Sequence, residues 1–161
     1  SIQGAGSVGM HLAEHLANDG ANVFISDIDK SKLENIDNPN INPIDDAFSL
    51  ECDVFSPCAL GAIFNESSIK SLNCKIIAGG ANNQLQDLSI ANALHNRGII
   101  YIPDILINSG GAIGLTKDLM KRNEVETESD LMNIAYRVRE ALTESQEKSI
   151  NLQDTIRELI I

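Results

Sequence analysis

Three glycines near the first residue have the spacing of a turn that binds phosphate groups. Gly4, Gly6 and Gly9 lie in the segment GAGSVG, and a helical pattern of apolar residues follows directly. In such a turn the first glycine permits the bend, the second lets the backbone approach a pyrophosphate, and the third lets the helix pack on its strand. The amides of Ser7 and Val8 would meet the phosphates at the positive end of that helix. The segment predicts a dinucleotide site, against the alternative of a glycine-rich turn that binds nothing.

An acid stands where a dinucleotide site requires one. Asp27 ends an expected strand over residues 22–27, where a carboxylate can accept hydrogen bonds from both ribose hydroxyls of adenosine. Together with Asp29 it would repel the additional phosphate of NADP, whereas Lys30 and Lys32 could neutralise that phosphate. The sequence therefore predicts NAD as the cofactor, against the alternative that Asp27 only ends a strand.

Polar residues also follow the later strands. Cys58 is expected to pack near the cofactor crevice, because no histidine accompanies it in sequence to make it a nucleophile. The amides of Asn82 and Asn83 could bind a ribose or a carboxamide, or could form a left-handed turn, and the pattern favours neither. Asn108 is expected to be a polar anchor, followed at Gly110 and Gly111 by a joint between two lobes.

The elements that must position these residues alternate between strands and helices. Strands are expected at 22–27, 53–55, 75–78 and 99–102, and helices after the glycine turn, at 31–36, around 88–94, from 108 to about 122, from 127 and from 151. This alternation predicts an α/β fold with a doubly wound parallel sheet, Rossmann-like, with additional C-terminal helices. We expect a single domain over residues 1–161. Its first strand is so short that we expect it to be truncated at the N-terminus.

Apolar residues at helical spacing predict which helix faces are buried. In the first helix these are Val8, Leu12 and Leu16, with Ala13 and Ala17 beside them. In the long helix they are Leu131, Ile134, Ala135, Val138 and Leu142. A cap formed by Thr127 and Asp130 is expected to start the long helix, and Asn151 is expected to cap the last one.

The composition limits the classes of function. The 161 residues suffice for one core, and no apolar run approaches the roughly 20 residues that span a bilayer. The formal net charge of -11 argues against a nucleic acid or an anionic membrane as a partner, since both need clustered Lys and Arg. The three cysteines have no metal-ligand spacing and are expected to be thiols of a reducing compartment. We therefore expect a cytoplasmic protein without a metal site.

Five segments in this order resemble one family: GAGSVG, ISDID, DVFSPCALGA, IIAGGANNQL and YIPDILINSGGAI. They look like the cofactor domain of the Glu/Leu/Phe/Val amino-acid dehydrogenases, and are most similar to the leucine, valine, phenylalanine and tryptophan branch. The resemblance implies an NAD-dependent oxidoreductase that reversibly deaminates an apolar L-amino acid to its 2-oxo acid and ammonium. It also implies a homo-oligomer for the full-length protein. The alternatives are a glutamate dehydrogenase-type domain and a non-catalytic module that senses NAD.

The resemblance also assigns roles to individual residues. The dinucleotide loop would comprise Gly4, Ala5, Gly6, Ser7, Val8, Gly9 and Met10, with Asp27 as the ribose ligand. Cys58, Ala59 and Leu60 would lie beside the cofactor, Asn82 and Asn83 near the nicotinamide ribose, and Asn108 by the nicotinamide and the substrate. Ala112 and Leu115 would border the pocket for the substrate side chain. The family's catalytic lysine and its acid partner belong to a preceding domain, so we expect no catalytic residue in this chain.

Overall fold

Six parallel strands form one sheet in the computed structural model, which describes residues 1–59, 61–117 and 119–160. The strands are β1 (Ile2–Gln3), β2 (Val23–Ser26), β3 (Ile41–Pro43), β4 (Cys52–Pro57), β5 (Cys74–Ile77) and β6 (Ile100–Tyr101). Their order across the sheet is β3-β2-β1-β4-β5-β6, so the winding reverses between β1 and β4. This order confirms the predicted doubly wound, Rossmann-like sheet.

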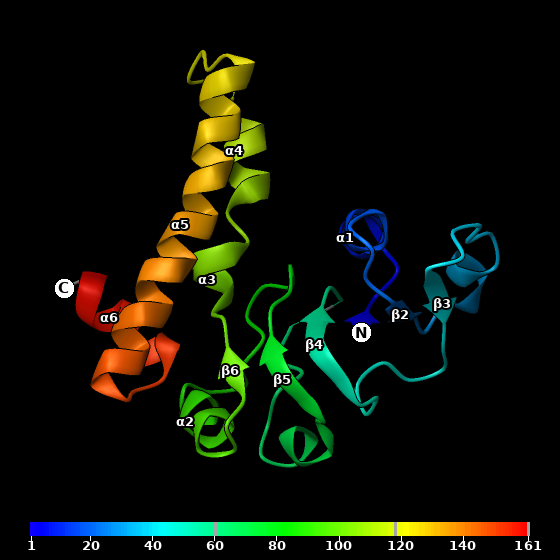
Figure 1. The fold of residues 1–161 in the computed structure, drawn as a ribbon, viewed down its shortest axis with the longest axis horizontal. Coiled ribbons are helices and arrows are strands. Elements are labelled where there is room, and N and C mark those ends of the chain that lie inside the picture. Colours follow the sequence, from blue (N-terminus) through cyan, green and yellow to red (C-terminus); the bar gives the residue numbers. More distant parts are fainter. Residues whose placement is uncertain (60, 118, 161) are drawn as a thin grey trace.

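Helices lie on both faces of the sheet and beyond its β6 edge. They are α1 (Ser7–Asn18), α2 (Ser89–Asn96), α3 (Asp104–Ile107), α4 (Gly110–Thr116), α5 (Glu124–Lys148), α6 (Leu152–Ile160) and the 3-10 turns η1 (Lys30–Leu33) and η2 (Ser68–Ser71). Because crossovers between parallel strands are right-handed, reversal of the strand order puts α1 and α2 on opposite faces. Figure 1 shows α1 above the row of strands and α2 below it.

An aromatic cluster fills the core between β4, β5 and α2. Phe55 and Phe64 are fully buried and pack edge to face with 6.1 Å between ring centroids. Phe48 packs edge to face on Phe55 at 5.2 Å, and Tyr101 extends the cluster from β6. This cluster fixes the strands whose carboxyl ends carry the candidate site.

Helix α1 meets the sheet through the small residues of its predicted apolar face rather than through the large ones. Val8 is 57% exposed, and Leu12 and Leu16 are only partly buried. The buried residues of α1 are Gly9, Ala13 and Ala17. These small residues let the helix backbone lie close to the sheet, and the larger apolar side chains flank the contact.

Residues 31–43 differ from the expectation in two ways. The helix expected over 31–36 is the single 3-10 turn η1, and residues 41–43, where no strand was expected, form the strand β3. Strand β3 pairs only with β2 at the sheet edge. Proline is accepted at such an edge, because its missing N–H interrupts no central ladder.

The long helix α5 begins earlier than predicted. Its cap is a capping box in which Asn123 Oδ1 accepts the Glu126 N–H and Glu126 Oε2 accepts the Asn123 N–H, each at 2.9 Å. Thr127 therefore lies inside the helix rather than at its start. Helix α4 is also shorter than the run expected to residue 122, whereas the predicted cap of α6 is confirmed, since Asn151 Oδ1 accepts the Asp154 N–H at 3.0 Å.

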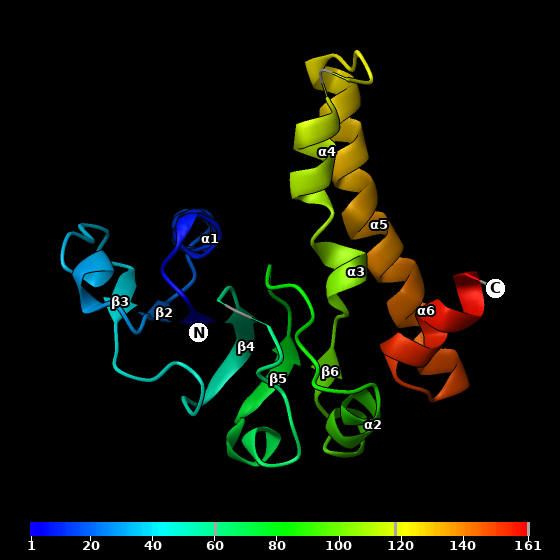
Figure 2. The same ribbon diagram turned by 180° about the vertical axis from the view of Figure 1, so that it is seen from behind.

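Helices α4 and α5 pack against each other and extend away from the sheet beyond β6, as Figures 1 and 2 show from opposite sides. The predicted buried face of α5 is correct only near the sheet. Leu131 is 42% exposed and Ala135 is exposed, whereas Val138 and Leu142 are partly buried and pack against the core that contains Ala141. Across the described ranges, no helix is long and apolar enough to cross a bilayer.

Candidate functional site

The turn between β1 and α1 is closed by contacts that only glycine allows. Gly4 has a φ of +103° and donates its N–H to the carbonyl of Ser26 at 2.8 Å. A Cβ on Gly9 would lie 1.8 Å from the carbonyl oxygen of Gly4, so no other residue fits without displacing the turn. A Cβ on Gly6 would meet no atom within 4 Å. The backbone at Gly6 is therefore open to a ligand.

The other residues of the turn divide into two groups. Ser7 and Val8 are exposed at the start of α1, where backbone N–H groups have no partner within the helix. Met10 instead donates its N–H to the Gly6 carbonyl at 2.9 Å, and its side chain packs against the core under α1. The backbone N–H groups of Ser7 and Val8 are thus accessible to an anion, whereas the side chain of Met10 is part of the core packing.

The carboxylate of Asp27 is fastened to the glycine turn. Its Oδ2 accepts the Ala5 N–H at 2.7 Å, its Oδ1 accepts the Asp29 N–H at 2.9 Å, and Lys32 Nζ lies 3.2 Å from both oxygens. Burial by itself raises the pKa of Asp27, but the two N–H groups and the Lys32 ammonium together lower the pKa below its ordinary value. Asp27 is therefore ionised and held rigidly beside the turn.

The segment after β4 closes the other side of the turn. Cys58 donates its N–H to the carbonyl of Gln3 at 2.8 Å, and the backbone N of Ala59 lies 2.9 Å from where a Cβ on Gly4 would stand. Burial raises the pKa of the Cys58 thiol more than the hydrogen bond with the Gly80 backbone lowers it. The thiol is therefore neutral, as expected for packing rather than for nucleophilic attack. Leu60 lies outside the described residues.

The three candidate asparagines lie together in the structure. Asn108 Nδ2 donates to Asn82 Oδ1, and Asn83 donates its N–H to Asp104 Oδ2 at 2.6 Å. Asn83 also has a φ of +51°, as the turn interpretation predicted. All four residues line one cleft with Gln84. The segments after β5 and β6 thus present a linked set of amides and one carboxylate.

Two residues of this cleft have roles that the sequence analysis missed. Gln84 is fully buried, and its Nε2 donates to the carbonyls of Gly79 at 3.0 Å and Ala81 at 2.8 Å. It therefore fixes the loop that carries the asparagines. A lone glutamine has no sequence signal, whereas Asp104 could have been noticed as an acid between a strand and Asn108.

The residues expected at the substrate side chain are not among the described residues that line this cleft. Ala112 and Leu115 share one face of α4, and Leu115 is 86% exposed. In the described chain this face of α4 is therefore open to solvent.

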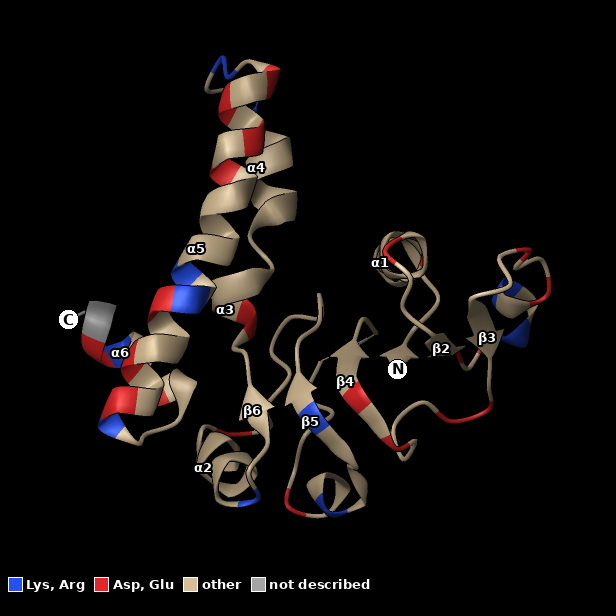
Figure 3. Cartoon of the chain, viewed as in Figure 1, with Lys and Arg blue, Asp and Glu red and all other residues tan. Residues whose placement is uncertain are grey.

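Charged residues give the site little further chemistry. Figure 3 shows acidic and basic residues interleaved along α5, and the basic residues of η1 beside β3. Among the described residues, no group of three or more His, Cys, Asp and Glu could hold a metal ion.

The comparison with protein families decides the relationship. Residues 24–155 match the family described as Glutamate/Leucine/Phenylalanine/Valine dehydrogenase. The chain belongs to this family. The predicted family is thereby confirmed, and the match includes Asp27, the segment after β4 and the asparagine cleft, whereas the segment GAGSVG lies before it.

Individual dehydrogenases of the family show how much of the sequence is shared. The chain is 37% identical to leucine dehydrogenase of Bacillus subtilis over an alignment of 154 residues that covers 93% of this chain and 42% of that enzyme. It is 33% identical to L-tryptophan dehydrogenase of Nostoc punctiforme over an alignment of 163 residues that covers 99% of this chain and 46% of that enzyme. The chain therefore spans less than half the length of these dehydrogenases.

Solved structures agree with this relationship. The crystal structure of the Nostoc punctiforme L-tryptophan dehydrogenase has a TM-score of 0.92 at 33% identity and covers 98% of this chain and 48% of that one. Hetero-hexameric glutamate dehydrogenase of Thermus thermophilus has a TM-score of 0.72 at 19% identity, covering 96% of this chain and 43% of that one. The second match shows a shared fold only.

Proposed function

We propose that residues 1–161 form the NAD-binding domain of an amino-acid dehydrogenase. One observation carries this proposal: the glycine turn that opens α1 is tied through the Ala5 N–H to the carboxylate of Asp27, at the point where the strand order reverses. Doubly wound sheets bind dinucleotides at this point, with phosphates at the helix start and the ribose at the acid.

Each part of the site has a role in this proposal. Open backbone at Gly6 and the exposed start of α1 would hold the pyrophosphate, and Asp27 would accept the hydroxyls of the adenosine ribose. Cys58 and Ala59 would pack beside the bound cofactor. The neutral amides of Asn82, Asn83 and Asn108 would orient the nicotinamide end through hydrogen bonds.

The proposed reaction is the reversible oxidative deamination of an apolar L-amino acid. NAD, when bound, supplies the acceptor for the hydride that leaves the α-carbon of the amino acid. The chain's own groups bind and orient the cofactor, and the lysine that assists water attack would come from outside these residues. The leucine, phenylalanine and tryptophan dehydrogenases among its relatives favour an apolar substrate over glutamate, with Ala112 and Leu115 bordering its side chain.

The whole protein would complete what this chain lacks. We propose that the cleft between this domain and a catalytic domain opens and closes around the joint at Gly110 and Gly111, and that closure excludes water during hydride transfer. We also propose that the whole protein is a homo-oligomer.

Titration of the 161-residue chain with NADH tests the proposal. The chain has no tryptophan, so the emission of the nicotinamide itself would be followed, and circular dichroism would establish folding. We expect saturable binding, no turnover of L-leucine, and about tenfold weaker binding by Gly6→Ala, because the added methyl group would occupy the open approach to the turn. A folded chain that binds no NADH would contradict the proposal.

A further inference from the structure

The carboxylate of Asp27 has no free side for a ribose. Its side chain is 7% exposed, and each of its oxygens accepts one backbone N–H and also contacts Lys32 Nζ. A carboxylate has about four lone-pair positions, and the two backbone bonds with the bridging ammonium use them. The ribose hydroxyls can therefore reach Asp27 only if Lys32 moves away.

Lys32 can move, whereas the carboxylate cannot. The Lys32 side chain is 44% exposed on the short turn η1, so its ammonium can leave the carboxylate for solvent. Backbone groups of Ala5 and Asp29 hold Asp27 from both sides. Arrival of a ribose would therefore displace Lys32 and leave the carboxylate in place.

The displaced ammonium would stay close to the ribose, because η1 follows Asp27 by only a few residues. A ribose that carries a 2′-phosphate would give Lys32 a new anionic partner, whereas a ribose with a 2′-hydroxyl would give it none. Lys30 differs from Lys32 in its partner. Its ammonium lies 3.0 Å from the carboxylate of Asp45, whose side chain is fully exposed, and not on the carboxylate of Asp27.

We infer that Lys32 sets the selectivity between NADH and NADPH at this site. It narrows the preference for NADH in two ways: it competes with the hydroxyls for Asp27, and it partly neutralises a 2′-phosphate. This inference rests on the proposed function, because it requires a dinucleotide at the turn. It goes beyond the proposed function by naming the residue that decides how strongly the site discriminates against the 2′-phosphate of NADPH.

Paired titrations of the 161-residue chain with NADH and NADPH test the inference. In Lys32→Met we expect the ratio of the NADPH to the NADH dissociation constant to rise about tenfold, which corresponds to about 1.4 kcal/mol. In the matched control Lys30→Met we expect the ratio to stay unchanged. Added salt should weaken NADPH binding more than NADH binding in the unsubstituted chain, and this difference should disappear in Lys32→Met.

The outcomes separate this inference from the proposed function. If the unsubstituted chain binds NADH but the ratio is the same in Lys32→Met, or changes equally in Lys30→Met, the inference is wrong and the proposed function stands. If the folded chain binds neither dinucleotide, both are wrong.

Discussion

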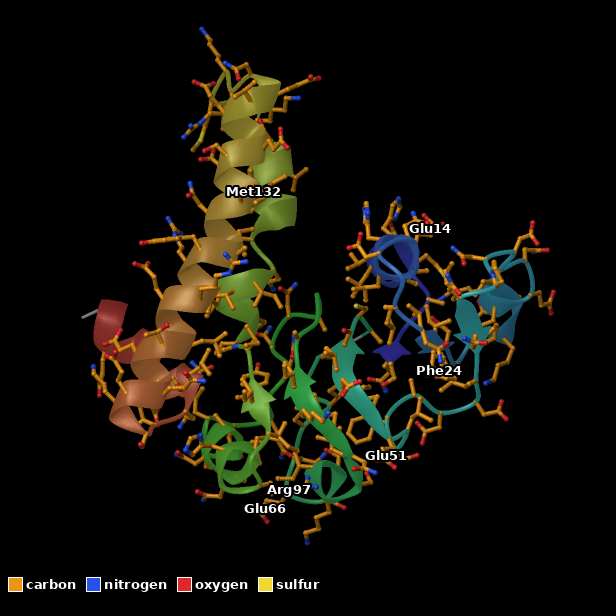
Figure 4. All side chains as sticks on the ribbon, in the orientation of Figure 1. Glu14, Phe24, Glu51, Glu66, Arg97 and Met132 are labelled. Carbon is orange, nitrogen blue, oxygen red and sulfur yellow. The ribbon has the colours of Figure 1, made fainter. Side chains whose placement is uncertain are left out.

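Two regions of the molecule are built by opposite means. One is the β1–α1 turn with the segments after β2 and β4 that contact it, called the crevice below, and the other is the helical pair α4–α5. In the crevice, residues far apart in sequence fix one another: Gly4 bonds Ser26, Ala5 bonds Asp27, and Cys58 bonds Gln3. In the outer part of the helical pair, apolar side chains face solvent. One of them is Met132, which is labelled in Figure 4 and is 67% exposed. A local capping box starts α5 there.

This difference has a consequence for substitutions. Long-range contacts in the crevice and in the core beneath it require particular shapes, so a change at one residue disturbs several segments. In the outer helical pair each residue acts mainly through its own helix, so a change has a small and local effect. The following predictions test this contrast, in order of decreasing effect.

The largest effect is expected in the core beneath the crevice. Phe55→Ala should lower the free energy of unfolding by about 3–5 kcal/mol, because it opens a cavity in the aromatic cluster. The matched control Met132→Ala on α5 should change it by less than about 0.5 kcal/mol, since that side chain is exposed. Urea unfolding followed by circular dichroism measures both, and equal losses would contradict the contrast.

Two glycines of the same turn should respond differently. Gly9→Ala should cost about 3 kcal/mol, because the added Cβ would lie 1.8 Å from the Gly4 carbonyl oxygen and force the turn apart. Gly6→Ala should cost less than about 1 kcal/mol, because its Cβ would point into open space. Thermal unfolding compares the stability of the two variants. A Gly9→Ala chain as stable as the unsubstituted one would show that the turn rearranges around the added methyl group at little cost.

A smaller effect, dependent on pH, is expected at Asp27. Its pKa lies below the ordinary value of about 3.9, so the unfolded chain binds the proton more readily than the folded one. The stabilisation is therefore complete at neutral pH and is lost as the pH falls from about 4 through the lower folded pKa. Asp27→Asn should cost about 1.5 kcal/mol at pH 7, and this cost should shrink below about pH 4.

Urea unfolding at pH 7, 5 and 3.5 measures this cost against a matched variant. Asp45→Asn should have almost no effect at any of these values, because the Asp45 side chain is fully exposed. A cost at Asp27 that is the same at pH 3.5 as at pH 7 would show that its charge does not stabilise the turn.

The smallest effect is expected at the start of α5. Asn123→Ala removes the bond from the Glu126 N–H to Asn123 Oδ1, keeps the backbone N–H of residue 123 that bonds Glu126 Oε2, and should cost about 1 kcal/mol. The loss should be confined to the first turn of α5, where hydrogen exchange would accelerate. Thr143→Ala, on the same helix, provides the control, and faster exchange throughout the sheet in Asn123→Ala would show that the helical pair is coupled to the crevice.

The sequence by itself determined the order of most of the elements, with β3 as the exception, and the chemical character of the site. The spacing of Gly4, Gly6 and Gly9 depends on local geometry, because a tight turn needs glycine, and Asp27 stands out as a carboxylate at the end of the next strand. The alternation of strands and helices was enough for the doubly wound sheet. The cap at Asn151 was also predictable, because capping is a local interaction.

Only the tertiary structure decided how these parts are paired. The buried face of α1 consists of Gly9, Ala13 and Ala17, because close packing on the sheet outweighs the burial of larger side chains. The linkage of Asn82 to Asn108 and the burial of Gln84 depend on loops that follow different strands. The contact of Lys32 with Asp27 is likewise a matter of side-chain placement, which spacing along the chain does not define.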